Sequence, residues 1–321
     1  MKAGYPGVCM VWKPIVVGVD GSPESVRAAS AGVMVAQRAG VECRLVHAVP
    51  DYLASFSTPD AVMDTSALTQ AAADHAREYI VSSLKDRVPD VMLARLEVEV
   101  GRAPLVLTDA VRRCEAGLLV LGGKHHRGLE RIGGSAITHL VRTIDVPILA
   151  TDGGSPVVTR VLAAVDLSYA AQPTIVEAQR WAELFGARLR VMHVVEPVPI
   201  IPGVPTTLGD DDFFRAEERA LETNIWPLVT MPGAETVVRR GRAAAAVADE
   251  VGKWQADLLV VGSHGKGWVD RLLIGSTSER LLHVLPTLTL VVPVVRPAHR
   301  GLGADLLPWE TRAVAGTEAR A

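Results

Sequence analysis

The feature that most constrains this chain is an internal repeat, in which short motifs return in the same order in two halves. An apolar run that ends in Asp20 returns as a run that ends in Asp166, and the segment around His47 returns around His193. Three later blocks also match: Gly101-Arg102 with Gly241-Arg242, residues 118–122 with residues 258–262, and Gly134-Ser135 with Gly275-Ser276. Matched blocks in a fixed order and at nearly constant spacing indicate two copies of one structural unit.

The length of 321 residues accommodates two units of ordinary domain size. We place a first domain at residues 1–152, a second at residues 153–296 and a C-terminal tail at residues 297–321. Turn-forming residues occupy nearly every position of the joint, residues 151–156. Because aromatic residues make up only 4% of the chain, the cores must consist mainly of Val, Leu, Ala and Ile.

Each half alternates short apolar runs with longer segments of helical period. Residues 15–19 and 258–261 are apolar at nearly every position, which is typical of strands buried on both faces of a parallel sheet. Ser22-Pro23-Glu24 is a helix start, and Gly40 is suited to end that helix. Strands are predicted at residues 13–20, 42–49, 92–100, 117–122, 146–150, 160–166, 187–195, 234–240, 257–262 and 287–295, and helices at residues 23–39, 65–87, 103–115, 134–143, 170–185, 211–229, 242–254 and 275–284. This alternation predicts right-handed βαβ units and a parallel sheet in each half.

The charge balance and the apolar runs argue against nucleic-acid and membrane partners. A formal net charge of −3 gives no reason to expect DNA or RNA binding, which relies on clustered positive charge. The start of the chain has no secretory signal, and no apolar run approaches the ~20 residues that a bilayer requires. Cys9, Cys43 and Cys114 are widely spaced and are read as reduced thiols. We therefore expect a soluble, cytoplasmic protein.

A glycine-rich stretch at residues 262–276 carries the clearest chemical signal. It follows a buried strand and leads into a helix, and glycines let main-chain N–H groups approach a phosphate closely. The hydroxyl of Ser276 could both cap the helix and contact phosphate. The patterns GxxxxGK[ST] and GxGxxG are both absent. From spacing alone, a loop that merely turns the chain remains an alternative.

The spacing of this stretch is G-x2-G-x9-G-S, formed by Gly262, Gly265, Gly275 and Ser276. It resembles the ATP-binding signature of the universal stress protein family. The resemblance extends over residues 13–150 and 158–295, and it includes the Asp-x-Ser openings, the histidines of the second strands and the Gly-Arg pairs. The complete glycine motif, in register with the other blocks, is the specific part of the match.

The resemblance implies two open, doubly wound α/β domains, each with a five-stranded parallel sheet of order 3-2-1-4-5, similar to adenine-nucleotide α-hydrolases. It implies a ligand at the switch point between the first and fourth strands. The ligand would be ATP or another adenine nucleotide, which Mg²⁺ can accompany. Asp166 would hold the adenine or ribose edge, and the backbone of Val194 would contact adenine. The implied binding residues are Ala164, Val165, Asp166, Val194, Val261, Gly262, Gly265, Gly275, Ser276 and Thr277.

The first half departs from this pattern, because His125 stands where the second half has Gly265. An imidazole there would crowd a phosphate that main-chain groups hold. The implied first site is therefore weaker, with Asp20, Ala48, Gly122, Gly134 and Ser135 as its residues. Either adenosine binds without a well-held phosphate tail, or basic side chains of residues 124–127 hold the phosphate instead. A metal site at His125-His126 is disfavoured, because adjacent loop residues seldom converge on one ion.

No arrangement typical of a catalytic centre is identifiable, and phosphoryl transfer would need a bound metal and a positioned nucleophile. The resemblance implies an ATP-binding regulator with slow hydrolysis at most. An ATP- or adenylate-using enzyme, such as a weak ATPase, and a nucleotide-free interaction module are the alternatives. The resemblance also suggests that the fifth strands pair, residues 146–150 against residues 288–295, which gives an internal pseudo-dimer that could dimerise again. We expect structural roles for His47, His193 and the tryptophans.

Overall fold

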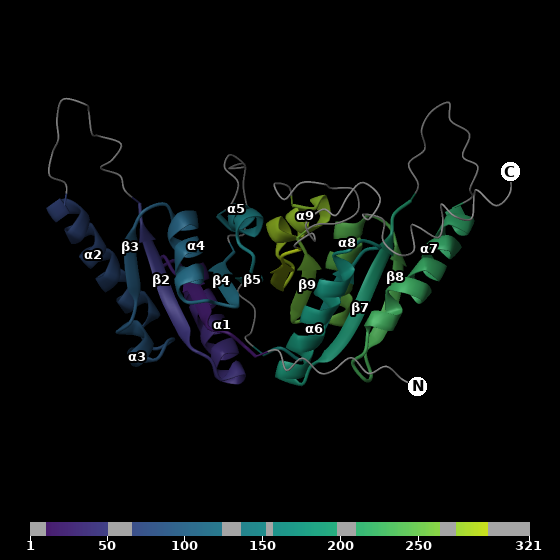
Figure 1. The fold of residues 1–321 in the computed structure, drawn as a ribbon, viewed down its shortest axis with the longest axis horizontal. Helices are drawn as coiled ribbons and strands as arrows, with labels where there is room; N and C mark the ends of the chain where they lie inside the picture. Colours follow the sequence, from purple (N-terminus) through teal and green to yellow (C-terminus); the bar gives the residue numbers. More distant parts are fainter. Residues whose placement is uncertain are drawn as a thin grey trace, which may run out of the picture. The chain divides into compact units, whose positions relative to one another are not determined.

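The computed structural model describes residues 11–50, 66–123, 136–151, 157–197, 210–263 and 274–294. The chain forms two compact units, which correspond largely to the two repeats (Figure 1). The first unit comprises residues 1–124 and 146–156, and the second comprises residues 125–145 and 157–321, so that α5 belongs to the second unit. The domain boundary at residues 152 and 153 stays a prediction.

In the first repeat the order of elements is β1 (Ile15–Gly18), α1 (Pro23–Ala39), β2 (Cys43–Val49), α2 (Ser66–Leu84), α3 (Asp90–Leu93), β3 (Glu97–Val100), α4 (Ala103–Arg113), β4 (Leu118–Gly122), α5 (Ala136–Thr143) and β5 (Ile148–Thr151). The second repeat contains β6 (Arg160–Val165), α6 (Ala171–Phe185), β7 (Arg188–Val195), α7 (Asp210–Asn224), η2 (Trp226–Leu228), β8 (Glu235–Arg240), α8 (Ala243–Trp254), β9 (Leu258–Gly262), α9 (Ser276–Val284) and β10 (Leu288–Val292). The two repeats therefore have the same alternation of strands and helices.

The strands of each repeat are parallel and follow the predicted order. The first repeat runs β3-β2-β1-β4-β5, and the second runs β8-β7-β6-β9-β10. Consecutive residues of β1, Ile15 to Val17, are all fully buried although they point to opposite faces. Helix α1 packs on β1 and β4, whereas α4 packs on β1 and β2. The predicted doubly wound fold is confirmed, and each repeat has a switch point between its first and fourth strands.

The start and the end of α1 are determined by local sequence, as predicted. The Ser22 hydroxyl oxygen accepts a hydrogen bond from the N–H of Ser25 at 3.2 Å, and Pro23 occupies the first turn. The helix ends at Gly40, whose φ of 66° lies in the left-handed region that glycine tolerates. These two residues determine where the chain turns back from β1 toward β2.

Two predicted elements differ from the structure. The strand expected at residues 92–100 begins only at Glu97, because Asp90–Leu93 forms the short helix α3 after Pro89. The helix expected at residues 211–229 ends at Asn224 and is followed by a 3₁₀ turn at Trp226–Leu228. Pro227 lies inside that turn and lacks the N–H that a continuing α-helix requires.

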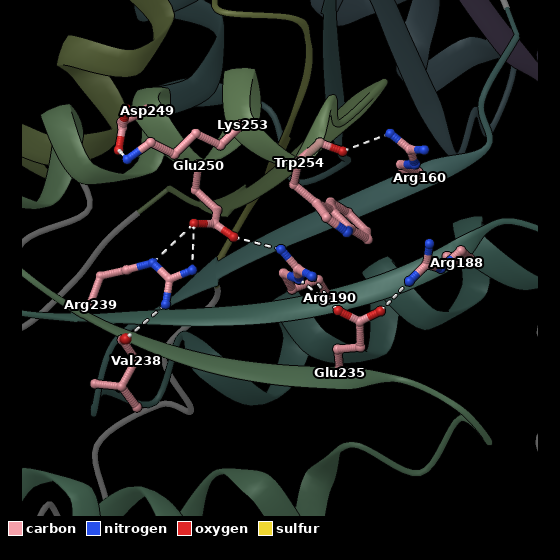
Figure 2. A network of polar contacts seen from close by, with 10 residues as sticks. All are labelled: Arg160, Arg188, Arg190, Glu235, Val238, Arg239, Asp249, Glu250, Lys253 and Trp254. Atoms are coloured by element: carbon pink, nitrogen blue, oxygen red, sulfur yellow. Dashed lines mark hydrogen bonds and ion pairs between the residues drawn. The ribbon is translucent and has the colours of Figure 1, made fainter.

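A network of charged side chains joins β7 and β8 to α8 in the second unit (Figure 2). The side chain of Glu250 on α8 is only 3% exposed, and it accepts hydrogen bonds from Arg190 Nη1 at 2.6 Å and Arg239 Nε at 3.0 Å. Arg190 also pairs with Glu235 and lies 4.5 Å from the ring centroid of Trp254. The hydrogen bond from Arg190 is the main cause that lowers the pKa of Glu235. These contacts attach the edge strand of the sheet to the helix that covers it.

Candidate functional site

An aspartate follows the first strand of each repeat and is held by the serine two residues later. Asp166 Oδ1 accepts hydrogen bonds from the N–H of Ser168 at 3.1 Å and from its hydroxyl at 2.5 Å. The Ser168 oxygen in turn accepts from the N–H of Ala170 at 3.1 Å, at the start of α6. In the first repeat, the exposed Asp20 accepts from the N–H of Ser22 at 3.0 Å. The Asp-x-Ser motif therefore fixes the direction of each carboxylate.

The histidines of the second strands tie those strands to the first strands. Nδ1 of His47 lies 2.7 Å from the carbonyl oxygen of Val19, and Nδ1 of His193 lies 2.9 Å from that of Val165. His193 is only 2% exposed. Since backbone carbonyl oxygens only accept, Nδ1 carries a hydrogen in both rings. This is the structural role that the sequence suggested.

The start of α9 is fastened to the end of β9 by residues of the glycine motif. The N–H of Gly275 donates to the carbonyl oxygen of Ser263 at 2.9 Å, and the hydroxyl of Ser278 donates to that of Gly262 at 2.7 Å. Gly275 is the N-cap residue, so the expectation that Ser276 caps the helix is wrong. The N–H groups of the first turn have no partner within the helix, and they form the positive end of its dipole.

A cavity of about 550 Å³ lies over the carboxyl ends of β6, β7 and β9 in the second unit. It brings together nearly all of the predicted binding residues of this repeat: Ala164, Val165, Asp166, Val194, Val261, Gly262, Gly275, Ser276 and Thr277. Gly265 lies outside the described residues. Because β6 and β9 are the first and fourth strands of this repeat, the cavity occupies the switch point of the sheet.

Sequence reasoning missed part of the cavity wall. Phe213 and Glu217 come from α7, and Glu196 follows β7. The remaining unpredicted wall residues include Met192, His193, Ala243 and Val247. Phe213 and Glu217 are four residues apart and therefore share one face of α7. This spacing was the local signal in the sequence that could have indicated their place in the cavity wall. Glu196 Oε1 accepts a hydrogen bond from the N–H of Ala243 at 2.8 Å, at the start of α8.

The two ends of the cavity differ in electrostatic character. Glu196 and Glu217 lie on the side of β7 and α7, and Asp166 follows β6, which runs between β7 and β9. Gly262 and the first turn of α9 lie toward β9. Carboxylates accept hydrogen bonds from hydroxyl and amino groups, whereas a helix N-terminus attracts anions. The cavity can therefore hold a molecule that has donors at one end and negative charge at the other.

In the first repeat, Asp20, Ala48 and Gly122 take the corresponding places at the ends of β1, β2 and β4, while Gly134, Ser135 and His125 lie outside the described residues. A Cβ at Gly122 would stand 2.6 Å from the backbone carbon of Glu24, so close packing against α1 already requires glycine there. A Cβ at Gly21 would stand 2.2 Å from the ring of Tyr79, a residue of α2. An aromatic ring thus lies against the loop that follows Asp20.

The described parts of the chain offer neither a metal centre nor a membrane-spanning helix. They contain no group of three or more His, Cys, Asp and Glu side chains that could hold a metal ion. None of the helices in these parts is long and apolar enough to cross a membrane.

The fold and the cavity define a class: open α/β proteins with a cavity at the switch point of a parallel sheet, the place where folds of this type commonly hold ligands. The model of the universal stress protein family matches residues 12–152 and again residues 158–293. The chain therefore belongs to the universal stress protein family, and it contains two such domains.

Relatives of both one-domain and two-domain length are found. A universal stress protein of Thermus aquaticus is 33% identical over 134 residues, which cover 41% of this chain and 96% of that protein. A universal stress protein of Mycolicibacterium smegmatis is 27% identical over 292 residues, which cover 88% of this chain and 97% of that protein. The tandem arrangement is therefore shared with full-length relatives.

Solved structures show the same fold. A universal stress protein from Archaeoglobus fulgidus superimposes with a TM-score of 0.58 at 18% identity, covering 87% of this chain and 98% of that one. A universal stress protein from Pseudomonas aeruginosa gives a TM-score of 0.53 at 18% identity, covering 88% and 93%. At this level of identity, the similarity extends to the fold alone.

Proposed function

We propose that the second domain binds an adenine nucleotide in the cavity over β6, β7 and β9, and that the protein acts as a nucleotide-dependent regulator. The observation that carries this proposal is the cavity, with carboxylates at one end and the first turn of α9 at the other. A nucleotide has the matching pattern, since its base and ribose carry hydrogen-bond donors and its phosphates carry negative charge.

The dimensions and the wall of the cavity suit such a ligand. A volume of about 550 Å³ lies within the range of ~300–1,000 Å³ that is common for small-molecule sites. Ala164, Val165 and Val261 provide an apolar wall beside the base, and Asp166 would accept from a ribose hydroxyl. Gly262, Ser276 and Thr277 would receive the phosphates, which Mg²⁺ could accompany. Bound nucleotide regulates only to the extent that it favours one state of the protein over another.

We expect the first domain to bind the nucleotide more weakly. Its Asp20 is exposed, and Tyr79 lies against Gly21. The glycine at position 122 is required by packing against α1, so that it carries no separate signal for phosphate binding. His125, which stands where the second domain has Gly265, also predicts weaker phosphate binding in the first domain.

The decisive experiment is mass spectrometry of the ligand released from freshly purified protein, combined with calorimetric titration of ATP, ADP and AMP. About one adenine nucleotide per chain would support the unequal sites, whereas two per chain would contradict the weaker first site. A protein that releases no nucleotide and binds none at millimolar concentration would overturn the proposal. Measurement of phosphate release in the same samples tests for hydrolysis.

Matched variants locate the binding site. Asp166→Asn should lower the affinity for ATP by about 10- to 100-fold, because a hydrogen bond to a charged acceptor contributes about 1.5–3 kcal/mol. Asp20→Asn is the control, since it makes the same change in the first repeat and should leave the affinity within about twofold. Equal effects of the two variants would contradict the assignment of the ligand to the second domain.

We further propose that the fifth strands of the two repeats, residues 146–150 and 288–295, pair to form the internal pseudo-dimer that the family resemblance suggests, and that the chain can dimerise. Size-exclusion chromatography with light scattering, in the presence and absence of ATP, tests whether the chain dimerises. A strict monomer that does not respond to ATP would contradict dimerisation. A cross-link between cysteines introduced at positions 148 and 290 tests whether the fifth strands pair.

A further inference from the structure

Glu217 on α7 makes a specific contact with a buried histidine in the wall of the cavity. Its Oε2 lies 3.1 Å from Nε2 of His193, and the two side chains are 13% and 2% exposed. The other ring nitrogen of His193 faces the carbonyl oxygen of Val165 at 2.9 Å. Both Glu217 and His193 line the cavity. The imidazole is thus held at both nitrogens, and it fixes the position of the carboxylate.

The positions of the protons on His193 and Glu217 determine which hydrogen bonds the two side chains can form. Nδ1 of His193 must carry a hydrogen, because it faces a carbonyl oxygen. The contact between Nε2 and Glu217 is then a hydrogen bond only when a second proton lies on Nε2 or on the carboxyl group. In either placement, the carboxyl group can also accept from a ligand, because it can take more than one hydrogen bond at a time. Glu217 therefore contributes a positioned acceptor to the wall of the cavity.

This acceptor lies at the end of the cavity that the base would occupy. His193 directly precedes Val194, whose backbone would contact the base, and Asp166 at the end of β6 would hold the ribose. Phe213, one turn before Glu217 on α7, adds an aromatic wall on the same side. The wall around Glu217 can thus enclose the edge of a planar base.

We propose that Glu217, positioned by His193, accepts a hydrogen bond from the exocyclic amino group of the bound base and selects 6-aminopurines over 6-oxopurines. This inference rests on the proposed nucleotide site. A 6-oxo group would place its own lone pairs against the carboxylate oxygen, and a site built around a hydrogen bond rejects ligands that cannot make it.

Within residues 66–84, which form α2, the first repeat has no carboxylate at the place that corresponds to Glu217. Leu221 on α7 and Ile225, which directly follows that helix, are buried, and they correspond to the buried Ile80 and Leu84 of α2 with the same spacing of four residues. In that register, Glu217 corresponds to Ala76. His47 keeps its bond to the backbone of Val19, so the histidine is common to both repeats, whereas the carboxylate is specific to the second. Selection by base should therefore be a property of the second domain.

The test compares three triphosphates in the full-length protein: ATP, inosine triphosphate, and purine riboside triphosphate, which has only hydrogen at position six. The wild-type protein should bind both analogues at least tenfold more weakly than ATP. This comparison needs no mutation, so a folding defect cannot explain its result. Equal affinities for all three would overturn the inference.

Variants then assign the selection to Glu217. In Glu217→Gln the amide can turn its NH₂ group toward a 6-oxo group, so the preference for ATP over inosine triphosphate should fall at least fivefold. Glu217→Ala should reduce the preference for ATP over purine riboside triphosphate to within about threefold. Glu222→Gln is the control, because Glu222 is an exposed residue of the same helix that does not line the cavity. Thermal melting of each variant shows that it is folded.

The outcomes separate this inference from the proposal on which it rests. A folded Glu217→Ala variant that keeps the full preference for ATP would overturn the role of Glu217 and leave the nucleotide site in place. A uniform loss of affinity for all three triphosphates would mean that Glu217 supports the wall without reading the base, which also overturns the inference. Failure of the wild-type protein to bind any of the three would instead refute the nucleotide site itself.

Discussion

Replacement of Glu250 by glutamine should destabilise the second unit strongly. The side chain of Glu250 is 3% exposed and accepts hydrogen bonds from Arg190 at 2.6 Å and from two nitrogens of Arg239 at 2.9 and 3.0 Å. Loss of one partner of a buried ion pair typically costs about 3–5 kcal/mol. Here Arg190 keeps Glu235, and the side chain of Arg239 is 45% exposed to water, so we expect about 2–3 kcal/mol.

Urea denaturation followed by tryptophan fluorescence measures this effect. Trp181 is fully buried in the second unit, and Trp254 belongs to the network itself, so fluorescence reports mainly on this unit. With a slope of about 2 kcal/mol per molar urea, Glu250→Gln should lower the midpoint by about 1 M. Asp211→Asn is the control in the same unit: Asp211 pairs with Arg240, its side chain is 74% exposed, and its loss should cost less than about 1 kcal/mol. An unchanged or raised midpoint for Glu250→Gln would refute the reasoning.

Three further predictions concern single ionisable groups. Because a hydrogen bond from Arg190 lowers the pKa of Glu235, this residue adds stability above its unfolded-state pKa, and acid titration of Glu235→Gln should show a smaller loss of stability than the wild type as the pH falls through the folded-state pKa. Burial raises the pKa of the Cys43 thiol to about 12, so at pH 8 iodoacetamide should alkylate Cys43 roughly a thousandfold more slowly in the folded protein than in urea, as peptide mass mapping would reveal; modification at similar rates would contradict this. Glu196→Ala removes the carboxylate that accepts from the N–H of Ala243 at the start of α8, and calorimetric melting should show a loss of about 1 kcal/mol, whereas no change would mean that water replaces the carboxylate fully.

Much of the fold could be predicted from the sequence, because the relevant signals are local. The apolar run at residues 15–19 indicates a strand covered on both faces, and Ser22 and Gly40 determine the ends of α1. The predictions failed where neighbouring signals compete. Residues 92–96 are apolar enough for a strand, but Pro89 and Asp90 initiate the short helix α3, which takes up residues 92 and 93.

The candidate site was predictable only in part, because only some of its residues are marked by local sequence signals. Asp166 and Gly262 lie at the ends of strands, where topology alone brings them together. Glu217 and Phe213 lie on α7, and their place in the cavity wall depends on how that helix packs against β7, which no short motif encodes. The contact between Glu217 and His193 joins two elements that the sequence does not visibly link.

The two repeats use opposite charges to attach a helix to the edge of the sheet, and this matters while the chain folds. Glu99 on β3 and Arg239 on β8 occupy the same register, opposite Ala48 and Val194, yet the helix partner is Arg113 in one repeat and Glu250 in the other. A newly made chain with two similar halves risks docking a helix on the wrong sheet. We infer that the reversed charges discourage this exchange, since α8 on β3 would bring Glu250 against acidic side chains. A chain with Glu99→Arg and Arg113→Glu should therefore refold more slowly and aggregate more, even if its native stability is kept.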